Sequence, residues 1–263
     1  MQRYFSNKCE NDYIYLNSDD MYHINKVMRM KNGDKIEIIY DNETYICGVI
    51  PSENKAKIIE KLDVKVDDQD IVLIVPLLKE QKMDLVLQKA TELGVSMIIP
   101  LETKRSVIKV DKEKFEKKQE RWQKICKEAS EQSKRTSIPI VSYLHKIDDL
   151  KNLDGVKLVC STTEKDKNLH FFLQSHNKCD KIVLAVGPEG GFDNDEEEQF
   201  VKNGFAKVSL GKRIMRVETV PIFLLSILNY LRVIYFIKET SILLFIYTSI
   251  VIYFDFLKGK NRK

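Results

Sequence analysis

The pattern of apolar and polar positions divides the chain into two regions with different rhythms. Up to about residue 68, short segments that alternate apolar and polar residues are separated by turn sequences such as Asp41-Asn42-Glu43. Alternation with a period of two predicts half-buried strands, and Asp and Asn favour the turns between them. We predict strands over 34–40, 44–50 and 55–61, the first two forming a hairpin. A short amphipathic helix is predicted over 23–30, with an apolar face of Ile24, Val27, Met28 and Met30.

From Ile71 onward, continuous apolar runs alternate with segments of helical period. Such runs suit strands buried in a parallel sheet, and they cover 71–77, 95–101, 138–143, 156–160, 181–186 and 207–210. Helices are predicted over 82–93 and 111–133, and the second would bury Phe115, Trp122, Ile125 and Ala129. The alternation predicts a mostly parallel α/β domain. The polar stretch 63–70 is the predicted boundary between the two regions.

A third helix is indicated by the residues at its ends. Asp193 and Glu196 have the spacing of a capping box, and Asn203-Gly204 is typical of a helix end. We therefore predict a helix between these positions.

Two glycine-bearing segments, 185–192 and 210–219, carry the strongest chemical signal. Each leaves a short apolar run, enters a turn and opens a helix. Gly190 and Gly191 permit a positive φ or the close approach of a ligand, and Pro188 fixes part of the turn. Open α/β sheets bind ligands at the carboxyl ends of their strands. Two such loops on neighbouring strands therefore predict a binding site.

The two loops match neither a Walker A motif nor a dinucleotide fingerprint. In the second loop, Arg213 and Arg216 flank the apolar pair Ile214-Met215, and Glu218 follows. Such a loop can hold an adenine ring while Arg and Glu contact charged or hydrogen-bond donor groups. An equally weighted interpretation is a plain turn in which Arg216 and Glu218 form a structural ion pair at a helix start.

Composition fits a globular protein of 263 residues, with 43% hydrophobic and 31% charged residues. The net charge of +4 is mild, but segment 104–135 holds 12 Lys or Arg against 6 Asp or Glu. This basic belt either neutralises nucleic-acid phosphates or is a solvated helix face.

Five scattered cysteines without a Cys-x-x-Cys pair suggest neither disulfides nor zinc, and favour a cytoplasmic setting. The amino terminus lacks the apolar core of a signal peptide.

The carboxyl-terminal segment differs abruptly from the rest. Its longest uncharged part, Thr240 to Phe254, is 15 residues long, which is short of the ~20 that a membrane-spanning helix needs. Four basic residues follow it, at 258, 260, 262 and 263. An extra core element, a membrane-associated tail and a non-native extension from a shifted reading frame all stay open.

Several of these motifs follow one another in a recognisable order. They are the pattern His23-Ile24-x-Lys26-Val27-Met28-Arg29-Met30, then Lys82-Met83-Asp84, Gln88–Val95, Trp122–Ile125, Glu128–Arg135, Gly187–Gly191 and Leu210–Thr219. Through them the chain, from Met1 to about Leu231, resembles the ribosomal RNA small subunit methyltransferase E family of the SPOUT group.

The resemblance implies an α/β protein with a PUA-like RNA-binding β-barrel over 1–68. It also implies a trefoil-knotted SPOUT methyltransferase domain over 71–231, leaving 232–263 as an apolar tail of unknown role. A knot is exceptional among folds. The implied enzyme is a cytoplasmic homodimer without a metal, acting in rRNA processing and ribosome biogenesis. It would use S-adenosyl-L-methionine to methylate N3 of a specific uridine in 16S rRNA, either free or in the small ribosomal subunit.

The resemblance also implies site residues. The cofactor would be held by loops around 161–164, 187–191 and 210–219, and the cofactor-binding residues would be Thr162, Gly187, Pro188, Glu189, Gly190, Gly191, Leu210, Gly211, Ile214, Met215, Arg216 and Thr219. We expect Arg216 to stabilise charge on the base or to orient it. Glu218 would accept a proton or hydrogen bond, or hold the loop. No general base is identified, and His23 is expected to be a packing or RNA-contact residue.

Uridine N3 lies on the Watson–Crick edge, so the target base must be unpaired or flipped. The predicted RNA contacts are Arg3, Lys26, Arg29, Lys31, Lys104, Arg105 and Arg135. One departure concerns the family pattern Thr-Glu-Thr-Ala, which here reads Val217-Glu218-Thr219-Val220. An alternative is therefore a non-catalytic RNA-binding or ribosome-assembly relative with the same fold. A different RNA or base atom as target is a further alternative, because fold does not fix substrate.

Overall fold

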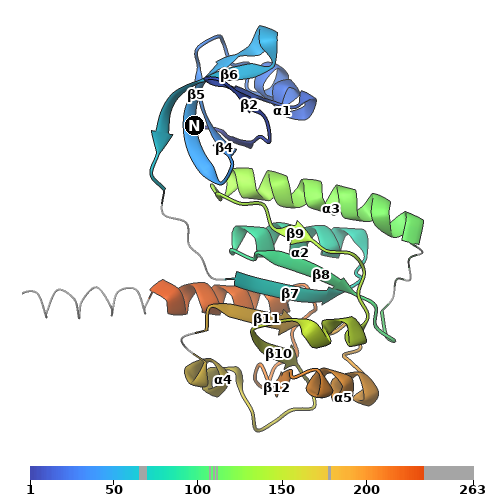
Figure 1. Cartoon of the computed structure of the whole chain (residues 1–263). Helices are drawn as coiled ribbons and strands as arrows, with labels where there is room; N and C mark the ends of the chain where they lie inside the picture. Colours follow the sequence, from blue (N-terminus) through green and yellow to red (C-terminus); the bar gives the residue numbers. More distant parts are fainter. Residues whose placement is uncertain (65–69, 107, 109, 111, 177–178, 234–263) are drawn as a thin grey trace, which may run out of the picture. The chain divides into compact units, whose positions relative to one another are not determined.

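The computed structural model describes residues 1–64, 70–106, 108, 110, 112–176 and 179–233 (Figure 1). The chain divides into two compact units, Met1–Ile222 and Phe223–Lys263. Both sheets belong to the first unit. In the second, residues 223–233 are helical and continue a helix that begins at residue 219. The predicted tail at 232–263 lies almost wholly outside the described residues.

The amino-terminal region forms a six-stranded sheet from described residues. Its strands are β1 (Arg3–Phe5), β2 (Cys9–Glu10), β3 (Tyr13–Tyr15), β4 (Lys35–Tyr40), β5 (Glu43–Ile50) and β6 (Lys55–Leu62), in the order β1-β4-β5-β6-β3-β2. The predicted hairpin is confirmed by the antiparallel pairing of β4 with β5. Period-two alternation buries Ile36 and Ile38 on one face of β4, where they pack with Ile14 and Val49. The strands β1, β2 and β3 were not predicted.

The predicted helix over 23–30 is wrong in extent and in its buried face. Helix α1 spans Ser18–Tyr22 and is capped by the side chain of Asn17, and a π-helical turn (His23–Val27) continues it. Met21 and Ile24 are buried, whereas Val27 and Met28 are exposed. The earlier start follows from the N-cap, which fixes the helix five residues before the predicted one. The wider π turn shifts the helical register by about one residue.

The second region is a fully parallel sheet of six described strands in the order β12-β10-β11-β7-β8-β9. The strands are β7 (Asp70–Pro76), β8 (Met97–Leu101), β9 (Ile140–Val141), β10 (Val156–Cys160), β11 (Lys181–Ala185) and β12 (Ala206–Val208). The predicted parallel α/β arrangement is thus confirmed. Strand β9 is shorter than predicted, because residues 138–143 pair with β8 only at Ile140 and Val141.

Besides the helix that begins at residue 219 after β12, four α-helices follow parallel strands. They are α2 (Glu80–Glu92), α3 (Lys112–Gln132), α4 (Leu169–Ser175) and α5 (Asn194–Lys202), and a short 3-10 helix, η3, spans Ile147–Asn152. The predicted capping box is present, since Asp193 and Glu196 exchange hydrogen bonds at the start of α5. Helix α4 was not predicted.

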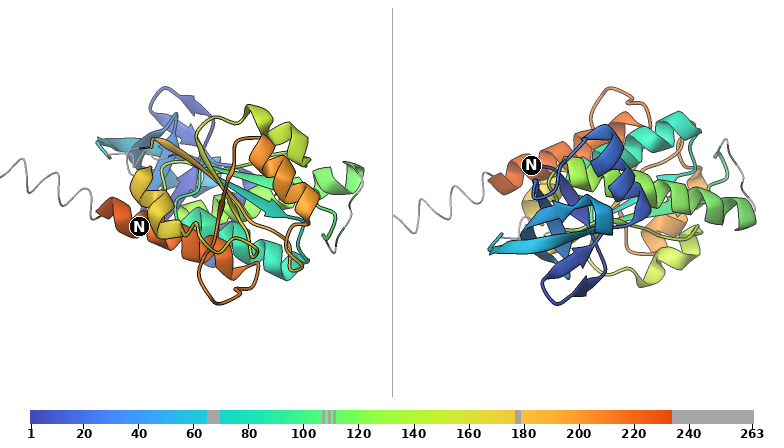
Figure 2. Two further views of the ribbon diagram at one scale, coloured as in Figure 1. Left: turned by 90° about the horizontal axis from the view of Figure 1, so that it is seen from below. Right: turned by 90° about the horizontal axis from the view of Figure 1, so that it is seen from above.

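Helices cover both faces of the parallel sheet. Figure 2 shows α2 on one side of the strands, with α5 and η3 on the other. On the α5 side, Phe192, Phe200 and Phe205 pack in series against strand residues such as Val72 and Val183. Because both faces are covered, the strands β7, β8 and β11 are almost continuously buried. This rigid sheet fixes where the loops at its carboxyl edge lie.

Candidate functional site

The predicted cofactor loops meet at the carboxyl edge of the parallel sheet. They follow β10, β11 and β12, which are adjacent in the sheet. The expectation that the two glycine-bearing loops lie on neighbouring strands is wrong in one respect, because β10 lies between β11 and β12. In the sheet, the strand that carries the loop 161–168 therefore lies between the strands that carry the two glycine-bearing loops.

The loop after β11 has a geometry that requires glycine. The amide of Gly191 donates to the carbonyl of Pro188 at 2.8 Å, and Gly191 has a φ of +67°. A Cβ on Gly187 would lie 3.1 Å from the ring of buried Phe192. A Cβ on Gly191 would lie 3.7 Å from the hydroxyl of Thr162, which places the loops after β10 and β11 in contact range. Backbone turns of this kind leave amide groups free of Cβ cover for a ligand.

A basic segment after β8 is fastened to the same loop. Arg105 donates from Nη1 to the carbonyl of Gly190 at 2.7 Å. The neighbouring Lys104 donates its amide to Glu196 at 2.7 Å, and its Nζ forms ion pairs with Asp193 and Asp195. Both residues were predicted as RNA contacts, and the structure places them beside the glycine loop.

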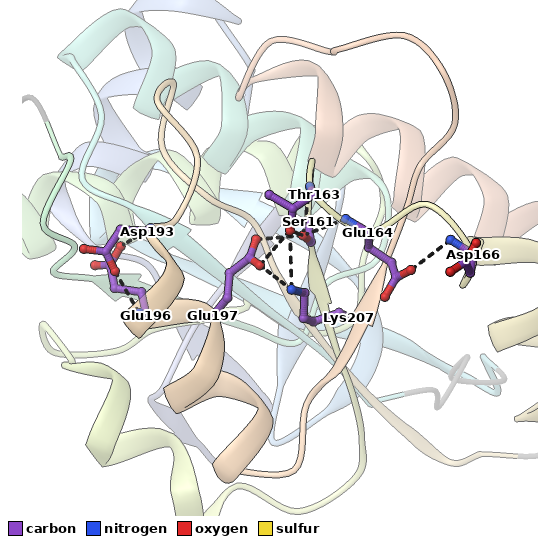
Figure 3. A network of polar contacts seen from close by, with 8 residues as sticks. All are labelled: Ser161, Thr163, Glu164, Asp166, Asp193, Glu196, Glu197 and Lys207. Carbon is purple, nitrogen blue, oxygen red and sulfur yellow. Dashed lines mark hydrogen bonds and ion pairs between the residues drawn. The ribbon is translucent and has the colours of Figure 1, made fainter.

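A buried carboxylate supports the loop after β10 (Figure 3). Glu197 on α5 accepts hydrogen bonds from Ser161 at 2.7 Å and from Thr163 at 2.9 Å, and Lys207 of β12 lies 2.5 Å from it. Burial alone would raise the pKa of Glu197, but the ion pair with Lys207 and the two hydroxyl bonds lower it below its usual range. The network ties α5 and β12 to the loop after β10. Sequence reasoning missed Glu197, although its position in the first turn of a predicted helix could have indicated it.

The loop after β12 brings both predicted catalytic residues to the site. Arg216 is exposed, and its guanidinium has no side-chain partner among the described residues. Glu218 is 15% exposed, and its Oε2 lies 3.5 Å from Nζ of Lys82. Lys82 also forms an ion pair with Glu189. The interpretation in which Arg216 and Glu218 pair with each other is therefore not what the structure shows, because the cation beside Glu218 is Lys82.

The remaining predicted cofactor residues lie along the same loop. Gly211 has a φ of +112°, and Ile214 is 87% exposed. Leu210 and Met215 are half-buried, and Thr219 is exposed at the start of the following helix. The departures from the family pattern, Val217 and Val220, are both buried.

The other five predicted RNA contacts fall into two groups. Lys26, Arg29 and Lys31 are exposed on and after the π-helical turn. Arg3 is buried, forms an ion pair with Glu37 at 2.8 Å and donates to the carbonyls of residues 134 and 135. Arg135 donates to the carbonyl of Thr91 at 2.7 Å. Arg3 and Arg135 are thus engaged in internal contacts.

His23 also has an internal partner, the hydroxyl of Tyr4 at 2.9 Å. Tyr4 itself is almost fully buried, and burial raises its pKa to about 12. This contact agrees with the packing interpretation of His23.

In the described part of the chain, no group of three His, Cys, Asp or Glu side chains is arranged to hold a metal. No helix there is long and apolar enough to cross a membrane.

Comparison with known proteins places this arrangement in a family. Residues 65–229 match a model described as an RNA methyltransferase domain, and residues 16–62 match an RNA methyltransferase PUA domain. A Ribosomal RNA small subunit methyltransferase E from Mesomycoplasma hyopneumoniae is 36% identical over 231 residues, covering 86% of this chain and 98% of the relative. The chain belongs to the ribosomal RNA small subunit methyltransferase E family. Its fold is accordingly α/β, with a PUA-like amino-terminal region and a parallel-sheet methyltransferase region.

Two further relatives support the assignment. The enzyme of the same name from Bacillus subtilis is 31% identical over 252 residues, covering 88% of this chain and 96% of that protein. The crystal structure of a Ribosomal RNA small subunit methyltransferase E from Neisseria gonorrhoeae bound to S-adenosyl methionine is 28% identical. It matches with a TM-score of 0.78 over 88% of this chain and 98% of that one. The family predicted from the motifs is therefore confirmed.

Proposed function

We propose that the protein transfers a methyl group from S-adenosyl-L-methionine to N3 of one uridine in 16S rRNA. The observation that carries the proposal is the meeting of three loops, 161–168, 186–193 and 209–218, at one edge of the sheet. The gonococcal relative, whose fold this chain shares, is bound to S-adenosyl methionine. Ligands of open α/β sheets bind at this edge.

The residues present fit such a cofactor on two counts. The turn at Gly187–Gly191 is rich in glycine and holds Gly191 at a φ of +67°, and glycine permits close approach of a ligand to the backbone. Oε2 of Glu218 is buried, has no aligned hydrogen bond among the described residues and lies 3.5 Å from Nζ of Lys82, so this carboxylate can still accept a bond from a ligand. The cofactor residues that we propose are those named from the motifs, on the loops that begin at Thr162, Gly187 and Leu210.

For this methyl transfer, the protein must align the two reactants and stabilise charge on the base more than it must activate the methyl group. When bound, S-adenosylmethionine supplies a methyl group that is already activated by the sulfonium. Uridine N3 carries an imide proton and is a weak nucleophile until that proton leaves. We assign Arg216 to stabilise negative charge on the base, because its guanidinium is exposed and uncommitted. Glu218 offers a carboxylate that orients a donor group.

The substrate must present an unpaired or flipped uridine. Lys26, Arg29 and Lys31 are exposed basic residues that can neutralise phosphates, and we keep them as proposed RNA contacts with Lys104 and Arg105. Arg3 and Arg135 stay among the proposed contacts, but Arg3 is buried and Arg135 is half-buried, so they are less accessible to RNA than the exposed Lys104 and Arg105. A ribosomal substrate favours a cytoplasmic location.

Three further features are proposed from the family resemblance. They are the trefoil knot in the parallel-sheet region, the homodimer, and the domain limits 1–68 and 71–231. The observed sheets span residues 3–62 and 70–208, which is compatible with those limits. Light scattering on the purified protein measures the dimer directly.

The deciding experiment combines cofactor binding with mapping of the product. Titration calorimetry with S-adenosylmethionine is expected to show saturable binding. Purified protein, cofactor and unmodified 16S rRNA are then expected to yield a single reverse-transcription stop, because N3 methylation blocks the pairing edge. Folded protein that binds RNA without binding the cofactor would instead support the non-catalytic alternative. A stop at another base or RNA would move the activity to a different target.

A further inference from the structure

The ammonium group of Lys82 lies between carboxylates of two loops that are distant in sequence. Lys82 is in the first turn of α2, just after β7. It forms ion pairs with Glu189 in the loop after β11 and with Oε2 of Glu218, at 3.5 Å, in the loop after β12. One side chain thus connects both glycine-bearing loops of the proposed cofactor site.

The two ion pairs differ in what they contribute. Glu189 is 46% exposed, and exposed ion pairs add little to stability. The hydrogen bond between the two side chains raises the pKa of Lys82 and lowers the pKa of Glu189. Glu218 is less exposed, and its buried Oε2 has no aligned hydrogen bond in the described part of the chain. Without Lys82, that buried oxygen would lose the cation beside it, which is the costlier loss.

We propose that Lys82 is a positioning residue that holds Glu218 in place and fixes the two loops, 187–191 and 211–218, relative to each other. The role is indirect, because Lys82 acts through Glu218. The inference deepens the proposed function and rests on it for the consequence in catalysis. Its structural half, the fastening of the loops, is testable without any ligand.

Helix α2 supplies a matched control. Lys89 lies two turns further along the same helix and pairs with Glu92 at 2.8 Å. Its side chain is 37% exposed, against 33% for Lys82. K89M therefore removes the same charge, at similar exposure, from an ion pair that stays within the helix. A difference between K82M and K89M in loop exchange or in methyl transfer therefore measures the effect of the ion pairs that join Lys82 to the two loops.

Hydrogen exchange of the ligand-free, full-length protein tests the fastening. In K82M, amides of both loops are expected to exchange roughly tenfold faster than in the wild type, because local opening becomes easier. K82R, which keeps the charge, is expected to restore most of the protection, and K89M to match the wild type. Wild-type exchange in both loops of K82M overturns the proposal.

Kinetics test the consequence for methyl transfer. K82M is expected to lower kcat roughly tenfold or more with a smaller change in KM for S-adenosylmethionine, since misplacement affects the reaction more than binding. If Lys82 acts through Glu218, the double variant K82M/E218Q loses no more than the more severe single variant. If the losses of kcat in the two single variants multiply in the double variant, Lys82 does not act through Glu218. If the wild-type protein neither binds the cofactor nor methylates RNA, the proposed function is refuted. The positioning role of Lys82 is then tested by the hydrogen exchange of K82M alone.

Discussion

Arg216 combines exposure with the absence of a side-chain partner in the described structure. Removing its side chain should therefore leave the fold intact while removing a positive charge from the site. We expect R216A to lower kcat for methyl transfer about 10²–10³-fold, the range seen when one stabilising donor is removed. Thermal unfolding should be unchanged. Wild-type turnover in this variant would remove Arg216 from the mechanism.

Gly190 has a different vulnerability from its neighbour Gly191. Its φ is not positive, so a side chain is not strained there, but a Cβ would lie 3.3 Å from Cδ of Arg105. We expect G190V to fold and to bind S-adenosylmethionine roughly tenfold or more weakly, because the new side chain covers the backbone. Calorimetry measures the affinity. If the double variant G190V/R105M binds like the wild type, the cause is displacement of Arg105 and not contact with the ligand.

The sequence predicts the role of a residue when a local motif indicates it. It does not predict a role that depends on partners distant in the chain. Gly187, Gly191 and Arg216 stand in recognisable loops, and the structure brings them to one edge. Lys82 stands in a motif as well, but its significance depends on carboxylates that the fold brings to it from two other loops. Single-sequence patterns report local conformation and burial, and they contain no information on such pairing.

At the scale of elements, the anchoring of α5 to β10 predicts an acid-sensitive contact. The pKa of Glu197 is lowered in the folded state, because the ion pair with Lys207 and the hydroxyl bonds outweigh burial. A lowered pKa contributes stability that is present above the usual glutamate value of 4.5 and is lost as pH falls through the folded value. We expect E197Q to cost about 1–3 kcal/mol at neutral pH, and less at acidic pH.

Urea unfolding at several pH values measures this dependence. E198Q is the control, since Glu198 is exposed on the same helix and should change stability little. A stability difference between E197Q and the wild type that stays constant down to low pH would contradict the assignment.

Elements with strong periodicity or a clear cap were predicted well. Helix α5 begins at its capping box, and α2 buries one apolar face. Helix α3 buries Phe115, Trp122 and Ala129 as predicted, whereas Ile125 is only half-buried. The short strands β1, β2 and β3 escaped prediction, because two or three residues are too few to establish a period. The π-helical turn after α1 was missed for another reason: its irregular hydrogen bonding leaves Val27 and Met28 exposed despite their apolar character.

At the scale of the molecule, the exposed basic group Lys26, Arg29 and Lys31 predicts how binding depends on salt. Removing one phosphate contact should reduce the slope of log K against log salt concentration by about 0.7–0.9. We expect K26A/R29A/K31A to weaken RNA binding most at low salt and to flatten this slope. Binding at several salt concentrations measures it. The control K8A/K57A/K61A removes equal charge from exposed positions elsewhere in the amino-terminal region. An equal loss of binding in both variants would show that Lys26, Arg29 and Lys31 contribute no more than other surface charges.

The strand order was beyond prediction from periodicity. Successive apolar runs predict parallel strands, but nothing in them places β10 between β11 and β12. That order brings the loop at 161–168 into the site between the other two. The resemblance to the family anticipated this loop, whereas the local pattern of the residues did not.

The segment between β11 and α5 is fixed at both of its ends. It starts at buried Val186, which bonds to β7, and finishes at Asp193, which caps α5. One turn into that helix, Glu197 holds the loop after β10. An inserted or deleted residue would rotate α5 and withdraw Glu197 from Ser161 and Thr163. The length of this segment is therefore as constrained as its glycines, because Glu197 reaches the loop after β10 only from one rotation of α5.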